Sequence, residues 1–141
     1  MGEIFENMEE IVKMLISTWE SIPRFYQKDR TVKRTLQCRL YSYLESQGLD
    51  VVADYFPPRT SDRPVDIVVI DKADPKKILL AICVDELVTL DAVKSLSAFD
   101  AERKIIFTIH PLEKKVKEST FFLKPGIEHY HIKGPQSTQL F

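Results

Sequence analysis

Asp66 is the residue whose chemistry most needs an explanation in this sequence. It stands in PVDIVVID, at the start of an apolar run. An ionised carboxylate is costly to bury unless a partner compensates its charge. Asp66 therefore either serves a functional site or is neutralised locally, by capping a turn or by pairing with Arg63 three residues earlier.

Two histidines near the C-terminus have a spacing that can bind metal. His129 and His131 flank Tyr130, so a β-strand would place both imidazoles on the same face. Such a pair can supply half of a zinc site, with His110 as a third ligand. No cysteine or carboxylate spacing completes the set, and we favour histidines on the solvated face of an edge strand.

Cations gather between residues 24 and 39, around the aromatic residues Phe25 and Tyr26. Arg30, Lys33 and Arg34 are the candidates for contacts with the phosphates of DNA or RNA. The net charge of the chain is −1, so no overall field attracts nucleic acid or membranes, and a solvated face is the simpler interpretation. The full cluster comprises Arg24, Lys28, Arg30, Lys33, Arg34 and Arg39, and a weaker one comprises Lys114, Lys115 and Lys117.

Length and composition fit a single globular domain. A chain of 141 residues is long enough to bury a core. Cys38 and Cys83 lie in apolar patterns far apart in sequence, which predicts reduced core residues of a cytoplasmic protein. We expect no membrane partner, because the sequence has no signal-peptide pattern and no apolar run of spanning length.

The elements that must position these residues can be predicted from hydrophobic patterning. Two β-branched runs, 65–70 and 78–84, flank the turn formers of 71–77 and predict antiparallel strands. The runs hardly alternate, so we expect helices on both faces of a mixed central sheet with 78–84 in its interior. Further strands are predicted at 51–56, 104–110 and 127–132, helices at 31–47 and 90–99, and a short helix or turn at 111–119.

Local signals mark the ends of two helices. Gly48 suits the position after the helix at 31–47. Thr89 is the predicted N-cap of the helix at 90–99, whose inward side chains should be Leu90, Val93 and Leu96.

An amphipathic helix precedes this α/β unit. Its apolar stripe could pack on the chain's own core or pair with a second copy, and we predict a homodimer through residues 4–19. The domain then divides into an N-terminal helix within 1–28, a core at 29–132 and a frayed polar tail at 133–141. The stripe consists of Ile4, Phe5, Met8, Ile11, Val12, Leu15 and Trp19.

The order of predicted elements resembles the PD-(D/E)XK nuclease fold, the restriction-endonuclease-like fold. The similarity is to the N-terminal domains of type I restriction subunits and to archaeal junction resolvases. It is carried by RPVDIVVID, KKILLAICVDE, LVTLDAVKSLSAF and RKIIFTIHP, within residues 31–111. The resemblance implies a site in which Asp and Glu hold Mg²⁺ and Lys orients or activates the attacking water.

The chain departs from that family at its Glu-x-Lys motif. One register of the third strand places Ile82 and Val84 there, and the other places Cys83 and Asp85. Neither register contains the motif, so Asp66 is the one clear family ligand. A single carboxylate does not hold Mg²⁺ against water at useful affinity.

A rebuilt metal site is one interpretation of the remaining charges. In it Asp66, Asp85 and Glu86 would bind Mg²⁺, and Lys94 would replace the missing lysine. In the other interpretation, which we favour, Asp85 and Glu86 form a solvated strand end and Lys94 is an exposed helix residue.

We therefore predict a nuclease-like domain that has no cofactor and acts as a nucleic-acid-binding or assembly module. A jaw domain of a small subunit shared by eukaryotic RNA polymerases resembles this fold and is not a nuclease. Two alternatives are kept: a metal-dependent DNA endonuclease with a relocated site, and a dimeric scaffold protein.

Overall fold

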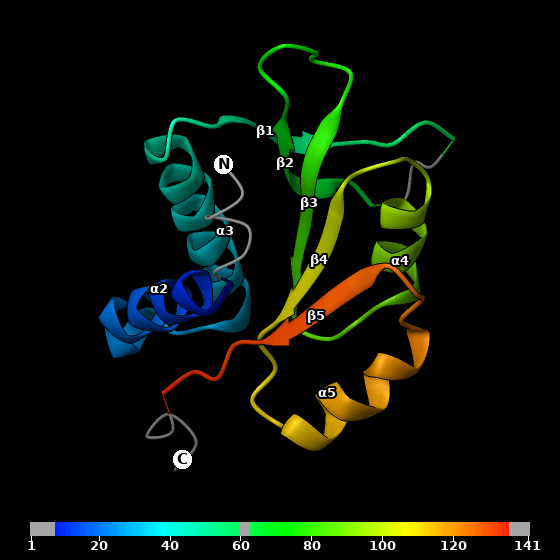
Figure 1. Cartoon of the computed structure of the whole chain (residues 1–141). Coiled ribbons are helices and arrows are strands. Elements are labelled where there is room, and N and C mark those ends of the chain that lie inside the picture. Colours follow the sequence, from blue (N-terminus) through cyan, green and yellow to red (C-terminus); the bar gives the residue numbers. More distant parts are fainter. Residues whose placement is uncertain (1–7, 60–62, 136–141) are drawn as a thin grey trace.

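The computed structural model describes residues 8–59 and 63–135 and shows helices on both faces of a five-stranded sheet (Figure 1). The strands are β1 (Asp50–Tyr55), β2 (Val65–Ile70), β3 (Ile78–Asp85), β4 (Arg103–Thr108) and β5 (Ile127–His131). The helices are α2 (Met8–Ser21), α3 (Asp29–Ser46), α4 (Leu90–Ser97) and α5 (Glu113–Ser119), and the 3-10 turns are η1 (Arg24–Tyr26) and η2 (Thr120–Phe122).

The strands follow the chain order across the sheet, β1-β2-β3-β4-β5. The pairs β1–β2 and β2–β3 are antiparallel, whereas β3–β4 and β4–β5 are parallel. Parallel neighbours need a crossover, and α4 and α5 lie in the two crossovers. The sheet is therefore mixed with β3 at its centre, which confirms the predicted antiparallel pair and the interior position of 78–84.

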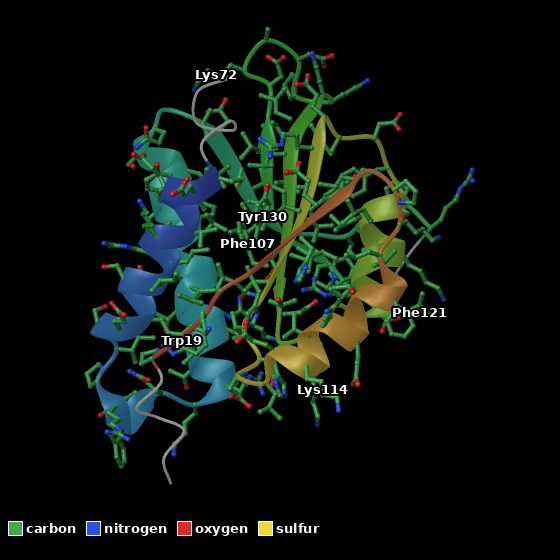
Figure 2. The ribbon with its side chains drawn as sticks, turned by 60° about the horizontal axis from the view of Figure 1, so that its bottom comes forward. Trp19, Lys72, Phe107, Lys114, Phe121 and Tyr130 are labelled. Atoms are coloured by element: carbon green, nitrogen blue, oxygen red, sulfur yellow. The ribbon has the colours of Figure 1, made fainter. Side chains whose placement is uncertain are left out.

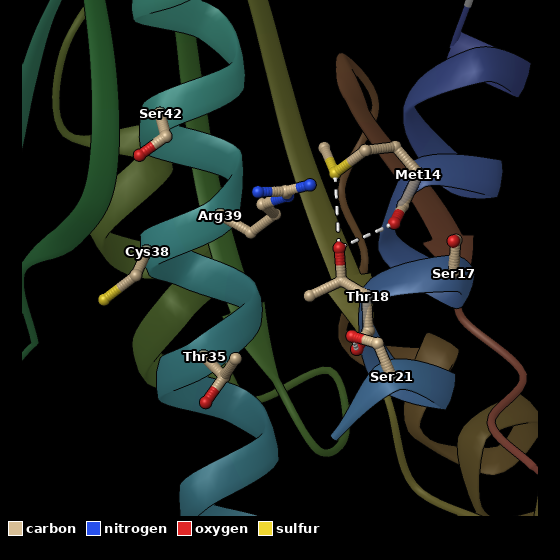
Figure 3. Close-up of a pocket in the computed structure, with 8 residues that line it drawn as sticks. All are labelled: Met14, Ser17, Thr18, Ser21, Thr35, Cys38, Arg39 and Ser42. Atoms are coloured by element: carbon tan, nitrogen blue, oxygen red, sulfur yellow. Dashed lines mark hydrogen bonds between the residues drawn. The ribbon is translucent and has the colours of Figure 1, made fainter. Parts of the chain in front are cut away.

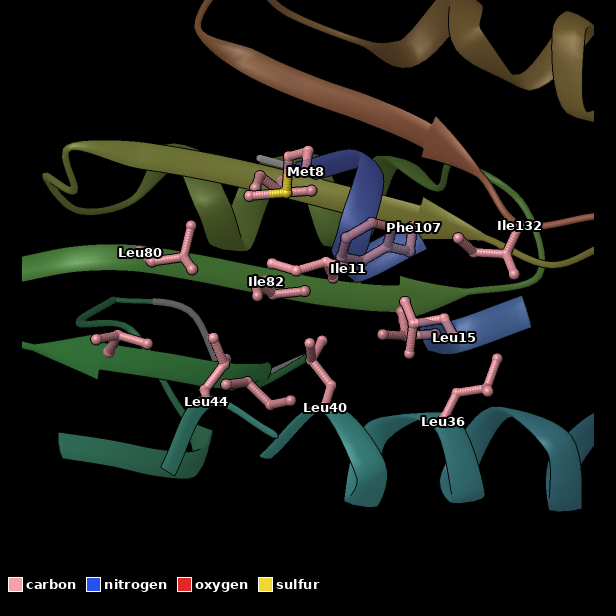
Figure 4. Packing of buried hydrophobic residues seen from close by; sticks show 14 of the residues in the cluster. Met8, Ile11, Leu15, Leu36, Leu40, Leu44, Leu80, Ile82, Phe107 and Ile132 are labelled. Atoms are coloured by element: carbon pink, nitrogen blue, oxygen red, sulfur yellow. The ribbon is translucent and has the colours of Figure 1, made fainter. Parts of the chain in front are cut away.

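One face of the sheet is covered by α2 and α3. Ile11 and Leu15 of α2 and Leu36 and Leu40 of α3 are fully buried against the sheet, where Phe107 of β4 is among their neighbours (Figure 4). The described part of the N-terminal stripe thus packs on the chain's own core. The predicted homodimer loses the exposed stripe on which it rested, and Ile4 and Phe5 lie outside the described residues.

The other face is covered by α4, with α5 on the same side (Figure 1). Thr89 caps α4 as predicted, because its hydroxyl accepts a hydrogen bond from the backbone N–H of Ala92 at 3.1 Å. Val93 and Leu96 are buried as expected. The prediction for Leu90 was wrong: it begins the helix on the solvent side and is exposed.

Several local predictions need correction. α3 begins at Asp29, earlier than expected, and no side chain caps it, while Gly48 follows it with a φ of +83° as predicted. Cys38 is exposed on α3, so it is not a core residue, whereas Cys83 is buried; both are free.

The start of the predicted polar tail is packed. Gly134 lies so close to the Trp19 ring of α2 that a Cβ atom there would be 2.4 Å from the ring, and Lys133 pairs with Glu113 at 3.2 Å. Gly134 and Lys133 thus contact α2 and α5, and residues 136–141 lie outside the described residues. None of the helices in the described ranges has the length and apolarity that a membrane crossing needs.

Candidate functional site

Asp66 lies where β2 and β3 separate. Their pairing runs as far as Ile67 opposite Ile82 and stops there. Beyond this point the Oδ2 atom of Asp66 accepts a hydrogen bond from the backbone N–H of Val84 at 2.7 Å. The carboxylate thus replaces a missing partner from the strand, since a buried backbone N–H must be satisfied.

Arg63 joins Asp66 to Asp85 at the end of β3. Its Nε and Nη2 atoms donate to the two carboxylate oxygens of Asp85 at 3.1 and 2.8 Å. Nη2 also donates to Oδ2 of Asp66 at 3.0 Å, and Nη1 lies 3.4 Å from Oδ1. The planar guanidinium suits this double contact, which a lysine could not reproduce.

The three side chains form a largely buried ionic cluster. Their exposed fractions are 14% for Arg63, 10% for Asp66 and 11% for Asp85. Helix α4 holds the cluster in place, because Ser95, itself buried, donates its hydroxyl to the backbone carbonyl of Arg63 at 2.5 Å. Arg63 also donates to the carbonyl of Pro64.

Burial raises the pKa values of two acidic groups at this site. It raises the pKa of Asp85, and the hydrogen bond and charge of Arg63 offset only part of that rise. Burial also raises the pKa of the neighbouring Cys83 thiol to about 12, so this thiol is neutral at physiological pH. One guanidinium therefore faces two carboxylates with no thiolate beside them.

The register of β3 is the second of the two that the sequence allowed. Ile82 and Val84 pack in the core under α2 and α3, whereas Cys83 packs with Val93 of α4. Asp85 continues the row of Cys83 and reaches Arg63. Cys83 and Asp85 thus share one face of β3, and Asp85 reaches the guanidinium that also contacts Asp66.

These residues do not fit a Mg²⁺ site. The oxygens of Asp66 and Asp85 already accept from a guanidinium, and a neutral thiol is a poor partner for a hard cation. Lys94 is exposed on α4, next to the buried Ser95 that contacts Arg63. In the described ranges, no three His, Cys, Asp or Glu side chains are grouped so as to hold a metal.

Glu86 is directed toward the start of α3 and does not join the cluster. Its pKa is raised, first by partial burial and then by the charge and hydrogen bond of Asp29. The charge of Lys33 acts in the opposite direction on both Glu86 and Asp85. Lys33 thus lies near the acidic residues Asp85 and Glu86 at the end of β3, on the same helix as the exposed Arg30 and Arg34.

The histidines of β5 meet on one threonine. Thr108, fully buried on β4, has its hydroxyl 2.8 Å from Nε2 of His129 and 3.0 Å from Nδ1 of His131. This confirms that both imidazoles lie on the same face of β5. Thr108 is paired with Asp85 of β3 in the sheet, so the histidines lie on the same face of the sheet as Asp85. Nδ1 of His110 instead accepts a hydrogen bond from the backbone N–H of Leu112, so this nitrogen is already occupied.

Two openings flank α3. The first, about 350 Å³, lies between α3 and the start of the sheet and is lined by both Arg34 and Asp66. The second, about 550 Å³, lies between α2 and α3, and Figure 3 shows the Arg39 side chain reaching into it from α3. Its other lining residues are Met14, Ser17, Thr18, Ser21, Thr35, Cys38 and Ser42.

The predicted phosphate-binding residues lie together at the start of α3. Arg30 and Arg34 are exposed and Lys33 is half-buried. The other basic cluster is on α5, where Lys114 is exposed near the bottom of the view in Figure 2. The structure thus separates the two basic clusters onto different helices.

Sequence reasoning named Arg63 as a partner of Asp66 but missed that it also binds Asp85. It missed the contributions of Ser95 and Thr108 as well. Arg63 directly precedes the Asp66 strand, so the pairing had a local signal. The contacts of Ser95 and Thr108 cross between elements far apart in sequence, and no local pattern indicates them.

A scan against protein-family models and searches of curated proteins and of solved structures found no match to this chain.

Proposed function

We propose that this chain is a nuclease-like domain that binds nucleic acid without cleaving it. The observed order of helix, three strands, helix and strand is compatible with the PD-(D/E)XK resemblance, and Asp66 opens the second strand as that resemblance requires. The cytoplasmic location and DNA or RNA as partner belong to the same proposal.

The carrying observation is the position of Arg63. Its guanidinium bridges Asp66 and Asp85, the two carboxylates that would have to bind the metal in a nuclease. An internal cation with a single positive charge therefore occupies the place between the two carboxylates that a divalent ion would take. It cannot supply the open coordination positions that activate water and hold a scissile phosphate.

Binding is assigned to the start of α3. Arg30 and Arg34 form no ion pair among the described residues, and both are exposed. Solvated cations of this kind can neutralise phosphates of a nucleic acid and thereby release the counterions that surround it. The first helix of the core would then contact the phosphate backbone.

The test is fluorescence anisotropy of labelled DNA and RNA oligonucleotides with the full chain at several salt concentrations. Reversing two charges with Arg30→Glu and Arg34→Glu should lower affinity by about tenfold or more and reduce the salt dependence. The matched control, Lys114→Glu with Lys115→Glu on α5, changes the net charge equally and should have little effect. Equal losses in the two double variants would contradict the assignment to α3.

The homodimer through residues 4–19 stays an untested prediction. The burial of Ile11 and Leu15 within one chain counts against it. Light scattering at high micromolar concentration distinguishes a dimer from a monomer.

A further inference from the structure

Two aromatic rings are held in solvent on the turn between α2 and α3. Phe25 is 80% exposed and Tyr26 is 57% exposed. Their rings contact each other edge to face, with centroids 5.2 Å apart. Exposed aromatic side chains gain free energy when a partner covers them, so a pair of them marks a contact surface.

Hydrogen bonds connect the turn that carries these rings to the residues around it. The backbone N–H of Tyr26 donates to the carbonyl of Pro23 at 2.8 Å, and that of Lys28 donates to the carbonyl of Tyr26 at 2.8 Å. The Gln27 side chain adds a hydrogen bond to the carbonyl of Ile22 at 2.8 Å. The rings are therefore presented by a fixed backbone, which limits the entropy lost when a partner binds.

Cations follow the rings directly. Lys28 precedes α3, and Arg30 and Arg34 lie in its first turns. All three are exposed, and none forms an ion pair within the described ranges. The nearby carboxylate of Asp29 interacts with Glu86, so part of the local negative charge is directed toward the sheet.

We propose that Phe25 and Tyr26, with these cations, bind single-stranded nucleic acid by base stacking. This inference rests on the proposed function and specifies its ligand. A duplex offers phosphates but keeps the faces of its bases stacked inside. It can therefore contact the cations, whereas Phe25 and Tyr26 find no base face on which to stack. An unpaired strand offers both phosphates and free base faces, which aromatic side chains bind with little regard to sequence.

The chain contains a matched control for the aromatic pair. Phe121 and Phe122 in η2 are 86% and 41% exposed, with ring centroids 5.7 Å apart, and Lys117 and Lys124 are close in sequence. Figure 2 shows Phe121 at the α5 side of the molecule, away from the blue helix α2. Exposed aromatic area alone would make the two pairs equivalent.

The experiment measures anisotropy of a labelled oligothymidine and of a labelled blunt duplex with the full chain. Wild type should prefer the single strand. The Phe25→Ala and Tyr26→Ala double variant should lose about ten- to a hundredfold in single-strand affinity and keep its duplex affinity and salt slope. The Phe121→Ala and Phe122→Ala variant should stay within about twofold of wild type.

A second variant separates stacking from general apolar contact. Phe25→Leu with Tyr26→Leu keeps apolar side chains at both positions but removes the π faces, and it should lose most of the single-strand affinity. Unchanged affinity in this variant would overturn the stacking proposal.

The remaining outcomes separate this inference from the proposed function. Duplex and single strand could bind with equal affinity, and the Ala and Leu variants of Phe25 and Tyr26 could both leave that affinity unchanged. This result would overturn the inference and leave the proposed function standing. No binding of any oligonucleotide would overturn both. Binding to phosphatidylserine vesicles, lost with Phe25→Ala and Tyr26→Ala, in place of oligonucleotide binding would assign the surface to an anionic membrane instead.

Discussion

Arg63 determines the charge balance at the end of β3. Two buried carboxylates would repel each other and lose their hydration without a cation between them. The guanidinium satisfies both and also fixes the segment before β2 against the strand. Asp66 in turn satisfies the free N–H of Val84, so the cluster has a structural role whatever the ligand of the protein is.

Removing the guanidinium should therefore lower the free energy of unfolding substantially. Arg63→Met leaves Asp66 and Asp85 buried without their cation and should cost about 3–5 kcal/mol of unfolding free energy, measured by urea titration. Adding Asp66→Asn and Asp85→Asn to the same variant removes the stranded charges and should recover at least about half of the loss.

An exposed ion pair provides the control for this prediction. Lys72 and Asp50 pair at 3.0 Å with side chains that are largely solvated. Lys72→Met should cost less than about 1 kcal/mol. A loss no larger in Arg63→Met than in Lys72→Met would contradict the view that Arg63 compensates buried charge.

At the scale of elements, side-chain hydrogen bonds join β4 and β5 in addition to the backbone hydrogen bonds of the strand pair. One Thr108 hydroxyl meets both histidines of β5, and it can donate to one ring nitrogen while accepting from the other. Burial lowers the pKa of His129, helped by the charge of His131. Burial likewise lowers the pKa of His131, although the charge of Glu113 opposes it.

These lowered pKa values predict a loss of stability in acid. The unfolded chain, with histidine pKa values near 6.5, binds protons more readily than the folded chain. The contribution of the two histidines to the unfolding free energy should therefore fall as the pH falls from about 8 to about 5. The change should be smaller in the His129→Gln and His131→Gln double variant, measured by urea titration at each pH.

Glu128 on the same strand gives a control with a different pH window. The hydrogen bond from Arg103 lowers its pKa below 4.5, so its contribution is present above that pH and is lost in stronger acid. Glu128→Gln should therefore leave the slope between about pH 8 and pH 5 unchanged. A slope that is insensitive to the histidine substitutions would contradict the assignment to His129 and His131.

The elements could be predicted where local pattern and burial agree. The β-branched runs of β2 and β3, the Thr89 cap and Gly48 after α3 all follow from residues adjacent in sequence. Leu90 was misplaced because helical spacing does not fix which side of a short helix meets the sheet. Cys38 was misplaced for a similar reason, as an apolar pattern around a residue does not place that residue inside.

The candidate site was less accessible to prediction than the fold. The Arg63–Asp66 pair is local, but the contact with Asp85 depends on the register of β3 and on where β2 diverges from it. The Thr108 contact likewise depends on the register across β4 and β5. Such contacts are set by tertiary packing, which a single sequence does not specify.

At the scale of the whole molecule, three regions have different chemistry. In the ionic cluster at the end of β3 one guanidinium pairs with two carboxylates, and the start of α3 presents solvated cations. The turn before α3 presents two aromatic rings beside those cations. This arrangement is the basis of our proposal that the chain binds nucleic acid on its surface without a hydrolytic centre.

The most direct test of that claim is a cleavage assay with the purified chain and Mg²⁺ or Mn²⁺. Linear duplex, branched and single-stranded DNA should all remain intact with wild type, and Asp66→Ala should change only stability, because it removes a partner of Arg63 and of the Val84 N–H. A relocated nuclease site would instead require Asp66, Asp85 and Lys94. Metal-dependent cutting by wild type that is abolished by Asp66→Ala would contradict the account and establish the endonuclease.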